Sequence, residues 1–587
     1  MWHFLKTVLA SAVGVLLALI VAGVGLVCWC AWLLAPDGED SALGRNSVLY
    51  IRLEGQTCEQ SHGSELDALL GETGLKLDLS VLRRAVDRAA KDKRIRGVFL
   101  EAGVLASDPA SLAELRQLIA QMKESGKPIV AYGDVYTQGA YYVCSVADEM
   151  ILNPEGMIDW HGLTAETMFY KDVMEKLGLR MEVFKVGDYK SYVEPYTSMK
   201  MSEADREQVT SYIGRIWADY VMTVSEARGV SPDTLESIAD RYALFMDPKD
   251  LLAAGMVDTL GYQDEARSLL RRSLGLDSKD ELCLVTPEDM VPEMETSSGG
   301  SVAIYYAEGS IVEEGADMPG IGGVIAGSAV VDDLDELERD DDVKAVVVRI
   351  NSGGGSAYAS EQIWHALRKL REKKPVVISM GGMAASGGYY ISSAADYIVA
   401  QPTTLTGSIG IFAMWTDASE LLTEKIGIGF DGVKTNKHSD MGALGRQMDA
   451  EERSMVQAYV ERGYDLFINR VATGRGMEEG RIREIAGGRV WTGEQAMKVG
   501  LVDSLGGLDV AVAKAAELAK MGDDYETVEY PKDEPWYVRL LEEGRDSYFE
   551  RKAAEELGEY YAILRQCREI VAGGKVQARI PYQIVVK

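Results

Sequence analysis

The stretch Met380–Gly410 reads MGGMAASGGYYISSAADYIVAQPTTLTGSIG and crowds small residues around one serine. Ser386 precedes two glycines and follows the apolar run Val376–Ser379, which the pattern predicts to be a buried strand. Small residues here let a substrate backbone approach closely and let backbone N–H groups point at it, as a nucleophile with an oxyanion hole requires. A strand-to-helix turn that admits only small residues would show the same pattern, so the motif alone is weak.

Two further motifs accompany this serine. Upstream, Lys344–Ile350 (KAVVVRI) predicts another buried strand, which runs into the flexible loop Asn351–Ser356 (NSGGGS). Downstream, Thr406–Gly410 (TGSIG) places the hydroxyl of Ser408 among glycines. Ligands of open α/β sheets bind at the carboxyl ends of strands, so we expect the loop to lie at a ligand-binding edge.

In this order and spacing, the three motifs resemble the signal peptide peptidase A family, the membrane-anchored serine proteases of the Clp protease and crotonase superfamily. The resemblance covers nearly the whole chain. It implies an α/β fold of two tandem crotonase-like (Clp protease-like) domains, built of ββα units and preceded by one transmembrane helix. Gly353 departs from the family pattern, which usually has proline there, and glycine loosens a loop that proline would stiffen.

The amino-terminal region predicts a membrane anchor. Val8–Ala35 is an uncharged run of 28 residues, long enough to span a bilayer. The apolar region of a cleavable signal peptide is only about 7 to 15 residues long, so an uncleaved anchor is favoured. Lys6 places the amino terminus in the cytoplasm by the positive-inside rule. We therefore expect a single-pass protein of the inner or plasma membrane, with its catalytic domains outside the cytoplasm.

An internal repeat organises the rest of the 587 residues. Ser47–Gly55 (SVLYIRLEG) matches Ser301–Gly309 (SVAIYYAEG), and Gln138–Tyr142 (QGAYY) matches Ser386–Tyr390 (SGGYY). The polar segment before Ser301 separates the two copies. The predicted units are residues 1–45 (cytoplasmic end, anchor and linker), 46–297 (the first copy) and 298–587 (the second copy, with a carboxyl-terminal extension).

Each copy alternates apolar runs with helical periodicity, which predicts α/β units. Ser111 and Glu114 have the spacing of a capping box and predict that a helix begins there. Two helical stripes are predicted to face the core and imply no cofactor. They are Leu115, Leu118, Ile119 and Met122 in the first copy, and Ile363, Ala366, Leu367 and Leu370 in the second.

The copies differ where chemistry is expected. The first copy has Gln138 opposite Ser386 and Trp160 opposite Ser408, and it has no counterpart of the glycine loop. It carries instead Gly187–Pro195 (GDYKSYVEP), which resembles the family segment that bears a general-base lysine. At that place the second copy offers only His438 or Ser439, depending on one gap. Neither copy is therefore complete alone.

A serine hydroxyl needs a base, and a lysine serves only when burial keeps it neutral. The resemblance implies that Lys190 is this base, that Ser386 is the nucleophile and that Ser408 orients the amine. Taken singly, Lys190 is more simply a solvated lysine and Ser408 a turn hydroxyl. The oxyanion donors implied are the N–H groups of Gly387 and of Gly354 or Gly355.

Other chemistries have less support in the sequence. The five histidines share no motif with a carboxylate, and His438 is the alternative base that lies near the position opposite Lys190. The six cysteines form no metal or disulfide pattern, and we expect neither metal nor organic cofactor. The net charge of −31 disfavours nucleic-acid partners.

The favoured function is a membrane-anchored serine endopeptidase. By resemblance, its substrates are cleaved signal peptides and similar apolar peptides, and it forms a homo-oligomer, a tetramer in the family. One alternative is a crotonase-like acyl-CoA enzyme, which explains neither the anchor nor Lys190. Another is an inactive oligomeric scaffold that binds peptides.

Overall fold

A computed structural model describes residues 43–44, 46–60, 76–277, 280, 282–291, 300–314, 323–522, 525–531 and 576–579. Within these ranges, no helix combines the length and apolar character needed to cross a bilayer. The anchor predicted at residues 8–35 lies outside the described residues, as does the predicted boundary at 297. Both therefore stay predictions.

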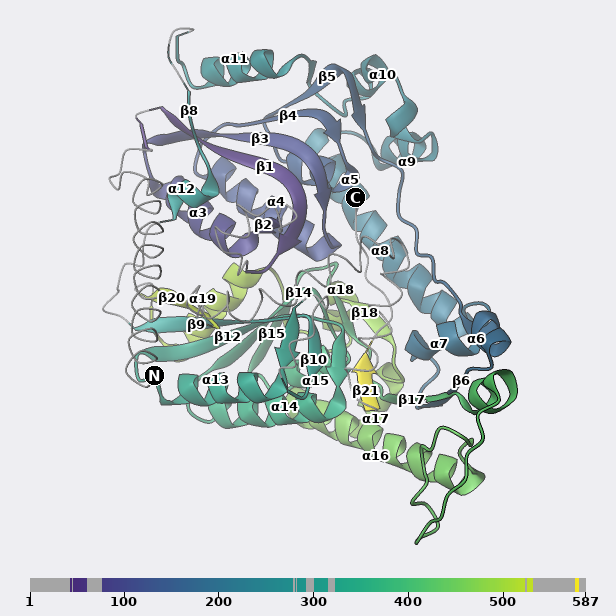
Figure 1. Cartoon of the computed structure of the whole chain (residues 1–587). Helices are drawn as coiled ribbons and strands as arrows, with labels where there is room; N and C mark the ends of the chain where they lie inside the picture. Colours follow the sequence, from purple (N-terminus) through teal and green to yellow (C-terminus); the bar gives the residue numbers. More distant parts are fainter. Residues whose placement is uncertain are drawn as a thin grey trace, which may run out of the picture.

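The first copy forms a sheet of seven strands whose pairings are all parallel, at the top of Figure 1. Its elements are β1 (Ser47–Cys58), β2 (Lys76–Asp78), α3 (Leu79–Lys91), β3 (Ile95–Ala106), α4 (Pro109–Glu124), β4 (Ile129–Tyr136), α5 (Gln138–Cys144), β5 (Glu149–Ile158), α8 (Glu203–Arg228), α9 (Pro232–Asp240), α10 (Pro248–Ala253), β7 (Thr259–Leu260), α11 (Gln263–Ser273), β8 (Cys283–Val285) and α12 (Pro287–Met290). The strand order is β2-β1-β3-β4-β5-β7, with β8 beside β1. Apolar side chains of the strands pack against α11 on one face and against α3, α4, α5 and α8 on the other.

The second copy repeats this plan with an eight-stranded sheet, in which β16 and β18 pair antiparallel and the other pairings are parallel. Its elements are β9 (Ser301–Glu308), α13 (Gly327–Arg339), β12 (Val343–Ser352), α14 (Ala357–Arg371), β14 (Val376–Ala385), α15 (Gly387–Ser392), β15 (Tyr397–Ala400), β16 (Leu405–Gly407), α16 (Ala450–Arg475), α17 (Glu479–Ile485), β18 (Val490–Thr492), α18 (Gly493–Lys498), β19 (Ser504–Leu505), α19 (Leu508–Ala519) and β20 (Glu526–Tyr530). The order is β18-β16-β14-β12-β9-β20, with β15 beside β14 and β19 beside β15. Helices α13 and α14 cover one face and α19 covers the other. The strands predicted before the glycine loop and before Ser386 are β12 and β14, and β14 runs on to Ala385.

A third sheet, which the sequence analysis did not predict, joins the two copies. Its members are β6 (Arg180–Lys185), β10 (Ser310–Val312), β11 (Val324–Ala326), β13 (Gly354–Ser356), β17 (Phe412–Asp417) and β21 (Val576–Arg579). The order is β11-β10-β13-β21-β17-β6. Strand β6 of the first copy pairs antiparallel with β17 of the second, and α6 (Lys171–Leu177) and α7 (Glu194–Thr197) flank it in the chain. Backbone hydrogen bonds therefore hold part of the first copy against the second.

A buried ionic network also crosses between the copies. Arg349 on β12 is inaccessible to solvent, and its Nε lies 2.9 Å from Glu59 Oε2. Its Nη2 lies 2.6 Å from Glu114 Oε2. A buried charge is costly unless it is paired, and here the guanidinium belongs to the second copy and both carboxylates to the first. Arg349 can therefore be buried with its charge paired only when the two copies pack together.

Helix α4 corrects one prediction from the sequence. It begins at Pro109, and the carboxylate of Asp108 accepts hydrogen bonds from the N–H groups of Ala110 (3.0 Å) and Ser111 (2.9 Å). The predicted start at a capping box formed by Ser111 and Glu114 is therefore wrong, because the Glu114 carboxylate binds arginine instead. The predicted core stripes of α4 and α14 are confirmed, since all eight side chains are buried.

Candidate active site

Ser386 occupies a strained turn between β14 and α15. Its backbone has φ 56° and ψ −111°, a conformation that costs a residue with a side chain on the order of 1–3 kcal/mol. The N–H of Ser386 donates to the carbonyl of Gly407 at 2.8 Å, and the residue is fully buried. The turn thus fixes the hydroxyl at the carboxyl end of a central strand, where the sequence predicted it.

Three of the predicted site residues meet at this turn. Lys190 Nζ lies 2.7 Å from Ser386 Oγ and 3.1 Å from Ser408 Oγ. The amine also lies 3.3 Å from the Ser408 carbonyl oxygen. Lys190 follows β6, so it comes from the first copy, whereas both serines come from the second. The arrangement thus brings one amine within hydrogen-bond distance of two hydroxyls.

Burial decides the electrostatic state of the amine. Lys190 is 1% exposed, and removal from water lowers its pKa well below the usual range of a lysine. Within the described residues, no carboxylate opposes this shift. The aromatic ring of Phe412 lies beside the amine, with its centroid 5.9 Å from Nζ. A lysine whose pKa is lowered in this way gives up its proton more readily, and its neutral form can accept a proton from a serine.

Two glycines of the second copy hold the backbone of the lysine segment. The N–H of Tyr189 donates to the carbonyl of Gly487 at 3.1 Å. A Cβ on Gly488 would lie 2.5 Å from the backbone nitrogen of Lys190, so no larger residue fits there without displacing the lysine. The sequence analysis missed both glycines, although a Gly-Gly pair is a turn signal that could have pointed to them.

The glycine loop lies against the start of α15. A Cβ on Gly387 would be 3.1 Å from Gly354 Cα and 3.2 Å from Gly355 N, so these backbones touch. Gly354 has φ 98°, and its N–H donates to Ser352 Oγ at 3.1 Å. The N–H of Gly354 is therefore engaged within the loop, and Gly355 is paired in the third sheet with Ile311 of β10 and Ala578 of β21.

The equivalent positions in the first copy hold no nucleophile. Gln138 is the first residue of α5, and Ser386 directly precedes α15. The side-chain oxygen of Gln138 accepts hydrogen bonds from the N–H groups of His161 and Gly162, both at 3.1 Å. Trp160 fills the position opposite Ser408, is fully buried, and donates to the Leu235 carbonyl at 3.1 Å. These contacts are structural, so the first copy contributes Lys190 to a site in the second.

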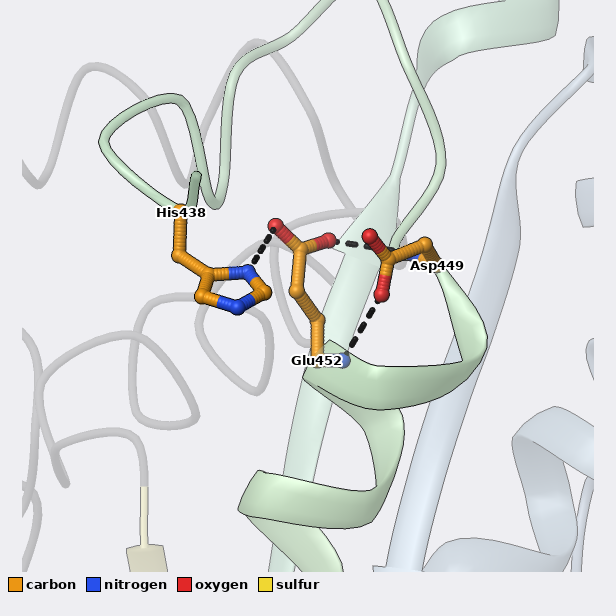
Figure 2. A group of neighbouring side chains, drawn as sticks. All are labelled: His438, Asp449 and Glu452. Carbon is orange, nitrogen blue, oxygen red and sulfur yellow. Dashed lines mark hydrogen bonds and ion pairs between the residues drawn. The ribbon is translucent and has the colours of Figure 1, made fainter. Parts of the chain in front are cut away.

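His438, the alternative base, lies elsewhere. Figure 2 shows it on a loop facing Glu452 and Asp449 at the start of α16. One potential ligand atom of each of the three residues lies within 4.8 Å of the other two, which is close enough for the three to hold one metal ion. However, Arg446 donates hydrogen bonds to both carboxylate oxygens of Glu452, at 2.6 and 2.7 Å. These bonds lower the pKa of the Glu452 carboxyl to about 2. Since the arginine already supplies the positive charge, these residues do not fit a divalent cation.

Comparison with known proteins gives two family matches. The model described as peptidase family S49 matches residues 121–277 and 368–522. The model described as Clp protease matches residues 324–404. The first match falls on both copies, and the second includes the glycine loop and Ser386.

Curated relatives cover most of the chain. It is 36% identical to "Protease 4" of Salmonella typhi, over 89% of this chain and 85% of that protein. It is 31% identical to "Serine protease SPPA, chloroplastic" of Arabidopsis thaliana, over 81% of this chain and 70% of that protein. A "Putative signal peptide peptidase SppA" of Enterococcus faecium is 32% identical over 43% of this chain and 80% of its own length.

Proposed function

The chain belongs to peptidase family S49 and is a serine protease, and from that premise we propose that Ser386 and Lys190 form its catalytic dyad. The observation that carries the proposal is the 2.7 Å separation of Lys190 Nζ from Ser386 Oγ in a fully buried setting. A neutral amine at hydrogen-bond distance can serve as general base for a hydroxyl. In the described part of the chain, no histidine touches Ser386.

The proposed reaction proceeds through an acyl-enzyme. Lys190 takes the proton from Ser386 as Oγ attacks the scissile carbonyl, and the N–H groups of Gly387 and of Gly354 or Gly355 stabilise the oxyanion. The protonated amine then gives its proton to the departing amino group. Water activated by the same lysine hydrolyses the ester. Ser408 keeps the amine pointed at Ser386 through its 3.1 Å contact.

We propose cleaved signal peptides and similar apolar peptides as substrates. The name of the Enterococcus relative and the apolar segment at residues 8–35 support this, because an enzyme anchored in a bilayer meets such peptides there. The same segment would hold the chain in the inner or plasma membrane, with the two copies outside the cytoplasm. The resemblance further favours a homo-oligomer, a tetramer in the family.

A fluorophosphonate that reacts with activated serines tests the dyad. The native protein should be labelled at one serine and should hydrolyse peptides, and Ser386→Ala should lose both properties. Ser268→Ala is the matched control, because Ser268 is exposed on α11 and should leave labelling unchanged. A folded native protein that neither labels nor cleaves peptides would favour the scaffold. Hydrolysis of an acyl-CoA thioester in place of peptides would favour the crotonase-like alternative.

A further inference from the structure

The backbone on both sides of Lys190 is held by one amide side chain, that of Gln208 on α8. Helix α8 belongs to the first copy and packs beside β18 of the second (Figure 1). Gln208 Nε2 lies 3.1 Å from the carbonyl oxygen of Tyr189 and 3.1 Å from Ser191 Oγ. The amide therefore contacts both the residue before the lysine and the residue after it.

The oxygen of the same amide reaches the second copy. Gln208 Oε1 accepts a hydrogen bond from the N–H of Val490 at 3.1 Å. Val490 is paired with Gly407, where β18 runs antiparallel to β16, and the Gly407 carbonyl accepts the N–H of Ser386 at 2.8 Å. A chain of backbone pairings thus leads from Gln208 to the serine.

The partners of Gln208 fix the orientation of its amide. Nε2 lies beside a carbonyl, a hydroxyl and, at 3.0 Å, Oδ1 of Asp205, whereas Oε1 lies beside an N–H. The reverse orientation would set the amide oxygen against a carbonyl and a carboxylate. Gln208 is 1% exposed, so a partner that lost its bond to the amide would be left buried and unpaired, which is costly.

A second contact to the lysine segment is more exposed. Arg489 Nη1 donates to Tyr189 Oη at 3.1 Å, and Arg489 Nη2 lies 2.9 Å from Glu207 Oε1. The Glu207 side chain is 56% exposed, and ion pairs at exposed sites contribute little to stability. The buried amide of Gln208 is therefore the stronger restraint on the segment.

On the basis of the proposed function, we infer that Gln208 is a positioning residue that fixes the Lys190 amine relative to the hydroxyl of Ser386. It acts through the backbone on both sides of the lysine. A displacement of about 1 Å between reacting groups can lower a rate on the order of 100-fold, so a restraint on this segment affects the chemical step. A looser segment should also admit water and let the pKa of Lys190 rise toward its usual value, because burial is what lowers it.

The test is Gln208→Met in the full chain, since methionine has a similar length and no amide. For a fluorogenic peptide, kcat should fall about 10- to 100-fold while KM stays near the native value. The ionisation seen in kcat/KM should move to higher pH, so part of the lost activity should return in alkaline solution. A native kcat and a native pH profile in a folded Gln208→Met protein overturn the inference.

Gln495→Met is the matched control. Gln495 on α18 also bridges the two copies, because its Nε2 donates to Ser211 Oγ at 3.0 Å, three residues further along α8 than Gln208. The control loses the same kind of bond between the copies and should keep the native kcat and pH profile. If Gln495→Met reproduces the loss of kcat and the pH shift, Gln208 acts only through the stability of the fold, and the inference is overturned.

Gln208→Asn serves if the methionine variant does not fold. Asparagine keeps the amide but is shorter by one methylene, so it cannot reach Tyr189 and Val490 at once and should show the same changes. Fluorophosphonate labelling separates failure of this inference from failure of the dyad. If native Ser386 is labelled and the Gln208 variant is labelled at the native rate at each pH, only the positioning role is wrong. If native Ser386 is not labelled, the proposed function itself fails.

Discussion

Lys190 Nζ and Ser386 Oγ lie 2.7 Å apart although 196 positions separate the residues in the chain. The contact crosses the internal repeat, because β6 before Lys190 pairs with β17 after Ser386. Each copy has lost what the other supplies: the first has Gln138 in place of the serine, and the second has no lysine at the corresponding place. The site therefore forms only when both copies are folded against each other.

Mixing two inactive variants tests whether one chain supplies the whole site. Because Lys190 and Ser386 of the same chain are in contact, co-expressed Lys190→Ala and Ser386→Ala chains should give no peptidase activity. Each variant co-expressed with the native chain should show activity in proportion to the native chains present. Recovery of activity in the mixed variants would mean that the dyad forms between subunits.

The depressed pKa of Lys190 predicts how activity depends on pH. The amine must be neutral to accept the serine proton, so kcat/KM should rise with pH along one ionisation below the ordinary lysine value of about 10.4. Lys190→Arg should be inactive at every pH tested, because guanidinium does not deprotonate in this range. Rates measured against pH check both outcomes, and near-native turnover by the arginine variant would remove Lys190 from the mechanism.

The free energy of unfolding should also depend on pH through Lys190. Between the lowered folded-state pKa of Lys190 and the unfolded-state value of about 10.4, the unfolded chain binds the extra proton, so the free energy of unfolding should rise with pH. Lys190→Met has no proton to bind, and its unfolding should lack this rise. Urea unfolding of both proteins at several pH values measures the difference. Equal slopes would show that Lys190 is not buried as a neutral amine.

The strained backbone of Ser386 predicts that this turn lowers the stability of the fold while it positions the hydroxyl. Glycine adopts φ 56° and ψ −111° without strain, so Ser386→Gly should be more stable than Ser386→Ala by about 1 kcal/mol, while both are inactive. Alanine is the matched control, because it removes the hydroxyl and keeps the Cβ. Equal unfolding midpoints for the two variants would argue against strain at this turn.

Loss of the buried arginine should destabilise the pairing of the two copies. Arg349→Met leaves the buried carboxylate of Glu59 without its arginine and leaves Glu114 with Arg83 alone, which should cost about 3–5 kcal/mol of unfolding free energy. Arg52→Met is the control, since the Arg52 side chain is 59% exposed and its ion pair is worth little. Chemical denaturation measures both, and an effect of Arg349→Met no larger than that of the control would contradict the role of the network.

The sequence alone determined the family and the parts of the site that are local in the chain. The family prediction is confirmed by the S49 match and by the curated relatives. The small residues around Ser386 and the two strands that enter the site were recognisable because strands and tight turns impose short-range patterns on residue type. The anchor at residues 8–35 and the roles of the site residues stay predictions.

The tertiary structure decided those features that depend on contacts between residues far apart in the chain. Nothing local marks Lys190 as buried, since its burial and its lowered pKa come from packing against residues of the other copy, among them Gly488, Ser408 and Phe412. The predicted start of α4 was wrong for two reasons: Glu114 bonds to the distant Arg349, and the local pair Asp108 and Pro109 marks the true start. The third sheet, with β21 between β13 and β17, was unforeseen because strand pairing joins backbone groups whatever their side chains.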